Sequence, residues 1–195
     1  TFGEAGCFSF YPTKNLGAFG DGGAIVTNRK DIYEKCKMIR NYGQKNRYEH
    51  EIYGINSRLD EIQAAILSVE LKYLDRFNKM RNKLAEIYIS LLSGVEEIRL
   101  PQIRPGNRHI FYLFVIEAQN RDELMKYLEK HHIPTLIHYP IPIHKQKCFS
   151  KFNNIHLPVV ENKVKTILSL PIHPFLKDKD IAYIAKNIIQ FYEIH

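Results

Sequence analysis

The chain has 195 residues, of which 45% are apolar and 25% are charged. This balance excludes a disordered or collagen-like protein, and the length allows one or two domains. The formal net charge of +7 favours an anionic partner such as phosphate, a nucleotide or a nucleic acid. No apolar run reaches the roughly 18 residues of a membrane helix and no basic stretch precedes an apolar one, so we expect a cytoplasmic protein without membrane contact.

Cysteine usage favours neither a disulfide framework nor a zinc ribbon. Cys7, Cys36 and Cys148 are odd in number and far apart, without the paired spacing of metal ligands, so we expect free or buried thiols. The first residue is Thr1, and the chain opens in the middle of a strand pattern. We therefore expect a fragment of a longer protein, in which a site found here is half of one.

In the first part of the chain, two short apolar runs, CFSFY and AIVT, lie among closely spaced glycines. This pattern predicts strand, loop and strand. Residues 31–40 have apolar side chains at helical spacing and predict a short helix. Residues 41–57 lack periodicity and predict a long ordered loop. Residues 59–93 predict a long helix, straight or kinked, that ends at Gly94.

The rest of the chain mixes strand-like and helix-like patterns, and a linker-like stretch precedes it. We expect an α+β unit with the following elements in chain order: a linker over 94–107, a strand over 110–118, a helix with a good N-cap over 120–132, a strand over 134–140, a proline-rich turn region over 140–158, a helix over 159–168, an extended piece over 169–174 and a terminal helix over 178–192.

Lys14 is the first candidate for chemistry. It follows a strand pattern and lies among aromatic residues, so it could be desolvated, which lowers the pKa of a lysine and makes the amine a usable nucleophile. The alternative is a surface lysine with its amine in water. The glycines that follow, GAFGDGG, match neither GxxxxGK[ST] nor GxGxxG, and a hairpin accounts for Asp21, Gly22 and Gly23 better than a phosphate-binding loop does.

Four motifs in order resemble one family. The motifs are SFYPTKNLGAFGDGGAIVTN, YGINSRLDEIQAAIL, LIHYPIPIHKQ and LSLPIHPFL, and together they span residues 9–176. They resemble the DegT/DnrJ/StrS family of pyridoxal-phosphate-dependent nucleotide-sugar aminotransferases, especially members that aminate a dTDP-linked 3-keto-6-deoxyhexose. The resemblance implies an α/β chain of fold type I, like aspartate aminotransferase. Residues 1–78 would complete the large cofactor-binding domain and start the connecting helix, and residues 79–195 would form the small α+β domain.

The resemblance also implies roles for residues near the first motif. Lys14 would form the internal Schiff base with pyridoxal 5'-phosphate and then shuttle the proton between the amino donor and the cofactor. Ser9 would donate to the cofactor phosphate, although a strand serine can instead meet a backbone group. Tyr11 would lie on the cofactor side and is a candidate for contact with the substrate's phosphate.

Three later residues receive roles in the same way. Asn56 would reach across a homodimer interface to the phosphate of the neighbouring subunit's cofactor; the alternative is a cap on the long helix. His138 and Tyr139 would contact the sugar or its diphosphate. We expect no metal site, because the histidines have no cysteine or carboxylate at ligand spacing.

The implied reaction moves an amino group from an amino acid, glutamate, to a keto group of a nucleotide-linked 6-deoxyhexose. The family's remaining cofactor contacts, including the aspartate that pairs with the pyridine nitrogen, would lie upstream of Thr1, so we expect these 195 residues to be inactive alone. Two alternatives stay open. One is a basic nucleic-acid-binding module, which the charge allows. The other is a non-aminating relative of the same fold. In such relatives histidine replaces the lysine, so the lysine at position 14 argues against this alternative.

Overall fold

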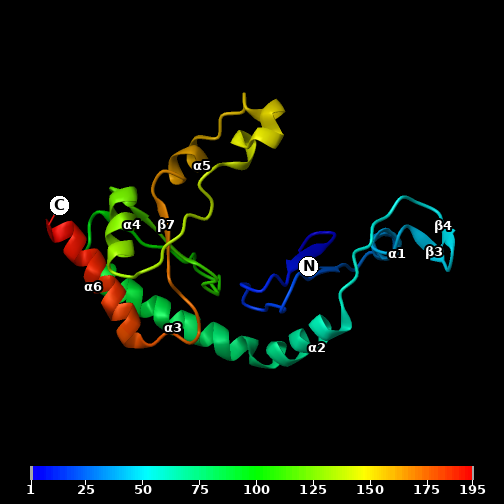
Figure 1. Ribbon diagram of the computed structural model, residues 1–195, viewed down its shortest axis with the longest axis horizontal. Coiled ribbons are helices and arrows are strands. Elements are labelled where there is room, and N and C mark those ends of the chain that lie inside the picture. Colours follow the sequence, from blue (N-terminus) through cyan, green and yellow to red (C-terminus); the bar gives the residue numbers. More distant parts are fainter. Residues whose placement is uncertain (1, 195) are drawn as a thin grey trace. The chain divides into compact units, whose positions relative to one another are not determined.

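The computed structural model describes residues 2–194 and divides into two compact units (Figure 1). Unit 1 is Thr1–Arg76 and unit 2 is Phe77–His195. Within the part of the chain that is described, no helix is both long enough and apolar enough to cross a bilayer.

Unit 1 begins with an antiparallel hairpin. Strand β1 (Gly6–Ser9) pairs with β2 (Gly23–Val26), with Gly6 opposite Val26 and Ser9 opposite Gly23. Helix α1 (Lys30–Ile39) follows. The predicted strand, loop, strand and short helix are therefore confirmed.

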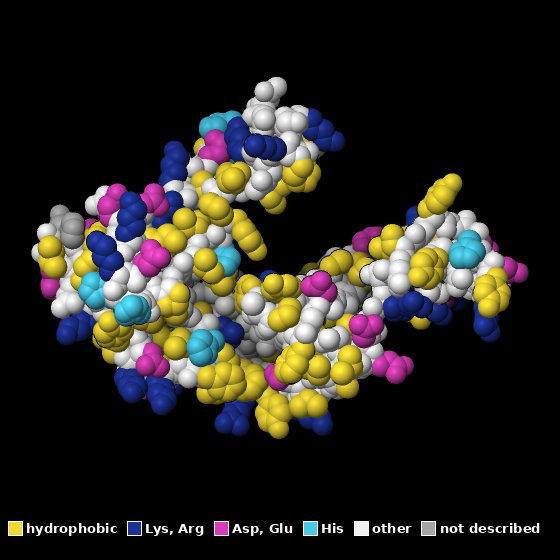
Figure 2. All heavy atoms as spheres, viewed as in Figure 1, with side chains coloured by type: hydrophobic (Ala, Val, Ile, Leu, Met, Phe, Trp, Pro, Cys, Tyr) yellow, Lys and Arg dark blue, Asp and Glu magenta, His cyan; other side chains and the backbone are white. Residues whose placement is uncertain are grey.

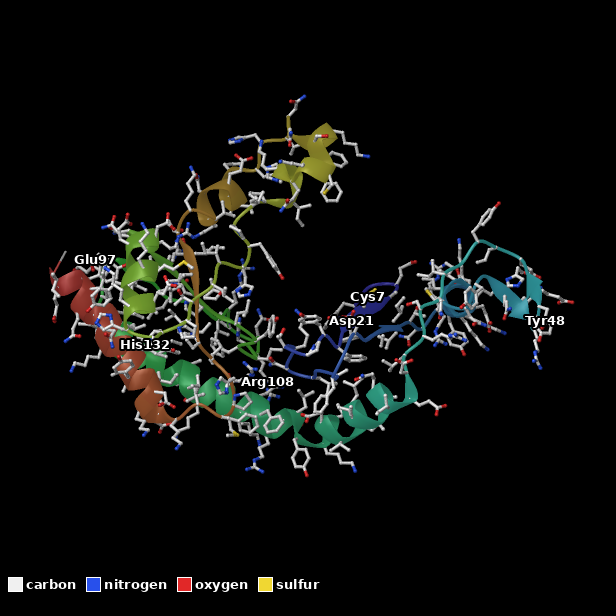
Figure 3. All side chains as sticks on the ribbon, viewed as in Figure 1. Cys7, Asp21, Tyr48, Glu97, Arg108 and His132 are labelled. Atoms are coloured by element: carbon white, nitrogen blue, oxygen red, sulfur yellow. The ribbon has the colours of Figure 1, made fainter. Side chains whose placement is uncertain are left out.

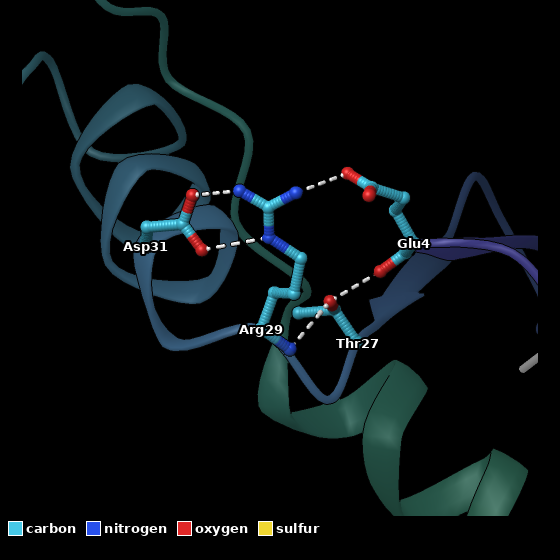
Figure 4. Close-up of polar contacts among 4 residues, drawn as sticks. All are labelled: Glu4, Thr27, Arg29 and Asp31. Atoms are coloured by element: carbon cyan, nitrogen blue, oxygen red, sulfur yellow. Dashed lines mark hydrogen bonds and ion pairs between the residues drawn. The ribbon is translucent and has the colours of Figure 1, made fainter.

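A polar cluster ties the start of β1 to the start of α1 (Figure 4). The hydroxyl of Thr27 donates to the backbone oxygen of Glu4 and accepts from the backbone N of Arg29. The Arg29 guanidinium binds both carboxylate oxygens of Asp31 and one of Glu4. Because these side chains are largely exposed, the cluster fixes local geometry more than it adds stability.

The long loop predicted over 41–57 contains a small hairpin, so that prediction was incomplete. Strand β3 (Gln44–Asn46) pairs with β4 (Glu49–His50) across a turn at Tyr48, whose φ is +70°. The strands are very short and their register is irregular, which leaves no alternation to detect in the sequence.

The long helix predicted over 59–93 is interrupted. Helix α2 (Glu61–Glu70) passes through the 3₁₀ turn η1 (Leu71–Tyr73) into α3 (Leu74–Leu92). A mid-helix 3₁₀ stretch tightens the backbone and redirects the apolar stripe. The boundary between the two units lies in the first turn of α3.

Unit 2 is built on a three-stranded antiparallel sheet of order β5-β6-β7. The strands are β5 (Ile98–Arg99), β6 (Phe114–Ala118) and β7 (Ile167–Leu170). Helices α3, α4 (Arg121–Lys130) and α6 (Asp178–Ile194) contribute to one apolar core with the sheet. The core consists of Leu84, Ala85, Tyr88, Leu92, Ile98, Phe111, Phe114, Ile116, Ala118, Leu124, Leu128, Ile133, Leu168, Leu170, Ile181, Ile184, Ala185, Ile188 and Phe191.

Several boundaries in unit 2 differ from prediction. The strand predicted over 110–118 starts only at Phe114, because Phe111 has a positive φ of +42°, which a strand cannot contain. Asn120 is the N-cap residue of α4, as predicted, but it has φ +51° and its side chain forms no capping bond. The linker contains β5, which pairs with β6.

Two more predicted elements are shorter than expected. The segment predicted as a strand over 134–140 contributes only an isolated bridge between Leu136 and Ser169. The helix predicted over 159–168 is α5 (Pro158–Lys163), and its expected last turn is already β7. A short apolar run such as TIL does not distinguish a helix end from a buried strand.

Two polar side chains of α3 hold the segment that follows β7. Arg81, which is buried, donates from Nη1 to the carbonyl oxygens of Ile172 at 2.8 Å, Phe111 at 3.3 Å and Tyr112 at 3.4 Å. The hydroxyl of Tyr88 donates to the oxygen of Pro171 at 2.9 Å. The backbone carbonyl groups just after β7 thus accept hydrogen bonds from side chains of α3 instead of from a neighbouring strand.

Residues 140–163 form an extension of unit 2 that we call the arm (Figure 1). It contains two 3₁₀ turns, η2 (Ile143–Lys145) and η3 (Lys147–Phe152), and α5.

Unit 1 exposes most of its large apolar side chains, and yellow side chains are prominent over its surface in Figure 2. Among its described hydrophobic residues, only Ala18 and Leu67 are buried. The hairpin therefore presents Phe8, Ile25 and Val26 to solvent.

Candidate functional site

The loop that carries Lys14 is closed by backbone hydrogen bonds. The N–H of Phe10 donates to the oxygen of Gly22 and continues the β1–β2 ladder. The N–H of Lys14 donates to the oxygen of Tyr11 at 2.9 Å, and the N–H of Ala18 returns to the oxygen of Phe10 at 2.8 Å. Lys14 is half-buried, at the end of a hairpin that fixes its backbone.

Gly17 allows this loop to close tightly. A Cβ at Gly17 would lie 2.5 Å from the carbonyl oxygen of Pro12, closer than any real side chain approaches backbone. The requirement for glycine here is close approach, not positive φ. The loop shape around Lys14 therefore depends on the missing side chain.

Ser9 and Tyr11 belong to the same local structure. The Oγ of Ser9 accepts a hydrogen bond from the backbone N of Tyr11 at 3.3 Å, which is the backbone contact considered as an alternative for Ser9. A hydroxyl that accepts one bond still has its own proton to donate. The contact is therefore compatible with Ser9 donating to a phosphate, and the side chain of Tyr11 is 52% exposed.

Gln63 was not predicted as a site residue from the sequence. Its Oε1 accepts a hydrogen bond from the backbone N of Phe19 at 2.8 Å, and its amide lies against Gly20. This bond joins the glycine loop to α2 across 44 residues. The sequence carries no signal for this contact, because a polar residue near the start of a helix does not by itself indicate a tertiary contact.

Asn56 lines a hollow of about 1080 Å³ in unit 1, between the β1–β2 hairpin, α1 and the segment that leads into α2. Cys7 and Asp21, labelled on the hairpin in Figure 3, also line it. The cationic side chains Lys37, Arg40 and Arg58 line it too, whereas Ser9, Tyr11 and Lys14 do not.

The backbone around Asn56 is paired, not helical. Asn56 forms an antiparallel bridge with Asn41, and the N–H of Ser57 donates to the oxygen of Arg40. The N-cap of α2 is Asp60, so the alternative that Asn56 caps the long helix is wrong. The carboxamide Oδ1 of Asn56 accepts from Nε of Arg58 at 3.0 Å.

His138 and Tyr139 lie in unit 2. His138 shares a hydrogen bond between its Nδ1 and the Oγ of Ser169 at 2.9 Å. The two rings are edge to face with centroids 5.6 Å apart, and Tyr139 is 71% exposed. The phenol of Tyr139 is thus presented to solvent beside an imidazole that β7 orients.

The structure therefore brings Ser9, Tyr11 and Lys14 together in one loop of unit 1 and places Asn56 on a separate hollow of the same unit. Among the described residues, no three side chains of His, Cys, Asp or Glu are grouped as metal ligands.

The donors present fit part of a pyridoxal-phosphate site. A half-buried primary amine, Lys14, lies five residues from a hydroxyl, Ser9, whose proton is available, and the hairpin fixes both. An amine and a hydroxyl donor are what the aldehyde and the phosphate of that cofactor need.

Comparison with known proteins gives the family. The family model described as "DegT/DnrJ/EryC1/StrS aminotransferase family" matches residues 1–189. The chain belongs to this family. The resemblance seen in the four motifs is confirmed.

Individual relatives support the same assignment. The chain is 45% identical over 172 residues to a dTDP-3-amino-3,4,6-trideoxy-alpha-D-glucose transaminase from Streptomyces venezuelae, covering 87% of this chain and 45% of the relative. It is 42% identical over 188 residues to a UDP-N-acetyl-3-dehydro-alpha-D-glucosamine 3-aminotransferase from Acidithiobacillus ferrooxidans, covering 96% and 51%. The chain spans about half the length of the curated relatives that it matches.

A solved structure supports the fold. S. venezuelae DesV in complex with a ketimine intermediate superposes with a TM-score of 0.91 at 40% identity, over 97% of this chain and 52% of that chain. The predicted fold class, a fold-type I transferase, is confirmed.

Proposed function

We propose that this chain is the C-terminal half of a pyridoxal-phosphate-dependent aminotransferase that moves an amino group from glutamate to the keto group of a dTDP-linked 6-deoxyhexose. The observation that carries the proposal is the closed loop from Ser9 to Gly17, which fixes Lys14 at the end of a hairpin. Relatives named for dTDP-sugars and for UDP-sugars both occur, so the nucleotide belongs to the proposal.

Residues of unit 1 would hold the cofactor. Lys14 would bind it covalently through Nζ, and the hydroxyl of Ser9 would donate to its phosphate. Bound pyridoxal phosphate supplies an electron sink that stabilises negative charge on the carbon next to the amine. Nζ of Lys14, once released by the incoming amine, would accept the proton from that carbon and deliver it to the cofactor carbon that carries the imine.

Other residues would act on the substrate and across a dimer. The amide Nδ2 of Asn56 would donate to the cofactor phosphate of the neighbouring subunit, which makes a homodimer necessary for activity. The hydroxyl of Tyr11 would donate to the substrate's phosphate. The imidazole of His138 and the phenol of Tyr139 would bind the sugar hydroxyls or the diphosphate. The net charge of +7 favours such a polyanionic substrate.

The test is borohydride trapping with pyridoxal phosphate, followed by peptide mapping of the modified lysine. It uses the chain alone and the chain co-expressed with the N-terminal half of the S. venezuelae transaminase, which supplies the length that this chain does not span; we call the second sample the complemented protein. Label confined to Lys14 supports the proposal. Lys14→Ala should lose the label, whereas the exposed Lys30→Ala should keep it.

A second outcome of the trapping experiment would contradict the proposal. Label that is absent, or scattered over surface lysines, in both samples would overturn the assignment of Lys14. The nucleotide is tested separately, by offering dTDP-linked and UDP-linked 3-amino sugars as amino donors with 2-oxoglutarate as the acceptor.

A further inference from the structure

The arm has no apolar core of its own. Of residues 140–163, all of which the structure describes, only His144 is buried. The arm's larger apolar side chains are exposed: Ile141, Ile143, Phe149, Phe152, Ile155, Leu157, Val159 and Val160. Polar contacts must therefore fix the shape of this segment.

Those contacts converge on Glu161 of α5. Its Oε1 accepts from the backbone N of Leu157 at 3.0 Å and from Nε2 of His144 at 2.8 Å, and its Oε2 lies 2.7 Å from Nδ1 of His156. The amine of Lys145 lies 3.8 Å from Oε1 and donates to the backbone oxygen of Asn153 at 2.8 Å. These bonds hold the pKa of Glu161 at about 2, so the carboxylate stays ionised.

A second polar contact lies just before the arm. His138 is bonded to the hydroxyl of Ser169, a buried residue of β7. The backbone of Leu136 pairs with the same residue in both directions, at 2.8 and 3.3 Å. The strand β7 therefore fixes both the backbone and the imidazole ahead of Tyr139.

The two contacts enclose a short, stiff segment. Five residues lie between His138 and His144, and two of them are Pro140 and Pro142, each with φ restricted by its ring. Chain connectivity closes the loop, because α5 with Glu161 leads directly into β7 with Ser169. Tyr139 has 71% of its surface exposed and lies between the two fixed ends.

We propose that Glu161, acting through His144, and Ser169, acting through His138, are positioning residues that hold Tyr139 and His138 in place for the nucleotide sugar. This inference rests on the proposed function, which assigns His138 and Tyr139 to the nucleotide sugar. Neither positioning residue touches the substrate itself. Binding of the amino-acid substrate should not depend on these two positioning residues.

Two variants and one control test the positioning role. Glu161→Leu removes all the acceptors, whereas Glu161→Gln keeps one carbonyl oxygen and should have a smaller effect. Asp178→Asn is the matched control, since Asp178 of α6 pairs with Lys83 of α3, and both residues lie outside the arm. Ser169→Ala tests the other end.

Amide exchange by mass spectrometry on the 195-residue chain is the first readout. Glu161→Leu should speed exchange over 138–157 at least about tenfold, the loss expected when a charge-assisted bond is removed, with β5–β7 unchanged. Asp178→Asn should leave exchange over 138–157 as in the wild type. Unchanged exchange in Glu161→Leu would overturn the inference.

Steady-state kinetics of the complemented protein separate positioning from folding. The probes are dTDP-3-amino-3,4,6-trideoxy-alpha-D-glucose and 2-oxoglutarate. Glu161→Leu and Ser169→Ala should raise KM for the nucleotide sugar by about tenfold and leave KM for 2-oxoglutarate unchanged. An equal change in both KM values, or none, would overturn the inference while leaving the proposed function intact. A wild-type protein without label at Lys14 would instead overturn the proposed function.

Discussion

Nε of Arg58 donates a hydrogen bond to Oδ1 of Asn56 at 3.0 Å. Since a guanidinium has only donors, the group facing it must be the carboxamide oxygen, and the Nδ2 donors of Asn56 point away. Arg58 is itself placed over the ring of Tyr42, 5.8 Å from its centroid. Arg58 thus turns Asn56 into an oriented donor on the edge of the hollow.

Asn56→Asp should weaken binding of pyridoxal phosphate to the complemented protein by about tenfold or more, because the change replaces two donors with a charge that repels phosphate. A spectrophotometric titration with the cofactor measures this. The exposed Asn28→Asp, which adds the same charge elsewhere in unit 1, is the control. Equal affinity in both variants would remove Asn56 from the site.

Gly17→Ala should reduce borohydride-trapped label at Lys14 by about tenfold, because the new Cβ would press on the carbonyl of Pro12 and displace the loop. Gly94→Ala is the matched control, since a Cβ there meets nothing within 4 Å. Peptide mapping gives the yield of label. Normal labelling in Gly17→Ala would show that the loop shape does not govern the reactivity of Lys14.

The stability of the arm should depend on pH in the acid range. The backbone N–H of Leu157, then His144, lowers the pKa of Glu161 from an ordinary value of 4.5 to about 2. A lowered folded-state pKa gives stabilisation that is complete above the unfolded-state value and is lost as the pH falls to about 2.

The measurement is the fluorescence anisotropy of a dye on the exposed Cys148 in the arm, with Cys7 and Cys36 replaced by serine. The wild type should show a more ordered arm than Glu161→Gln at pH 7, and the difference should vanish between pH 4.5 and about 2. A difference that persists at pH 2 would contradict the ionised carboxylate as its source.

Tyr88→Phe should lower the free energy of unfolding by about 1–3 kcal/mol, because the carbonyl of Pro171 loses its donor inside the core. Burial raises the pKa of Tyr88, so its hydroxyl remains a donor above the pH at which a tyrosine ordinarily loses its proton. Urea unfolding gives the difference. Tyr183→Phe, which removes a longer exposed bond to His131, should change the midpoint much less.

Sequence patterns predicted the helices whose apolar residues recur at a regular spacing. Helix α1 and helix α6 matched, since each repeats its apolar spacing over several turns. The β1–β2 hairpin followed from its glycines. Asn120 is the N-cap residue of α4, as predicted, but its left-handed backbone in the turn after β6 goes with a side chain that forms no capping bond.

The sequence predicted the motifs that carry the site residues, but not the contacts that connect these motifs in the fold. Lys14 and Ser9 lie in one motif, and their loop is local. The bonds that organise the rest join residues far apart in sequence: Gln63 to Phe19 across 44 residues, and His138 to Ser169 across 31. Such pairs leave no spacing signal, because tertiary packing creates them.

The unequal share of buried apolar side chains has a consequence for any denaturation experiment. Nearly every buried hydrophobic residue among those described belongs to unit 2, whereas unit 1 buries only Ala18 and Leu67. Cooperative melting and its heat-capacity change scale with apolar surface removed from water. A calorimetric transition of this chain would therefore report the unfolding of unit 2. The Lys14 loop could open, and its amides exchange, well below the midpoint temperature of that transition without changing the calorimetric curve.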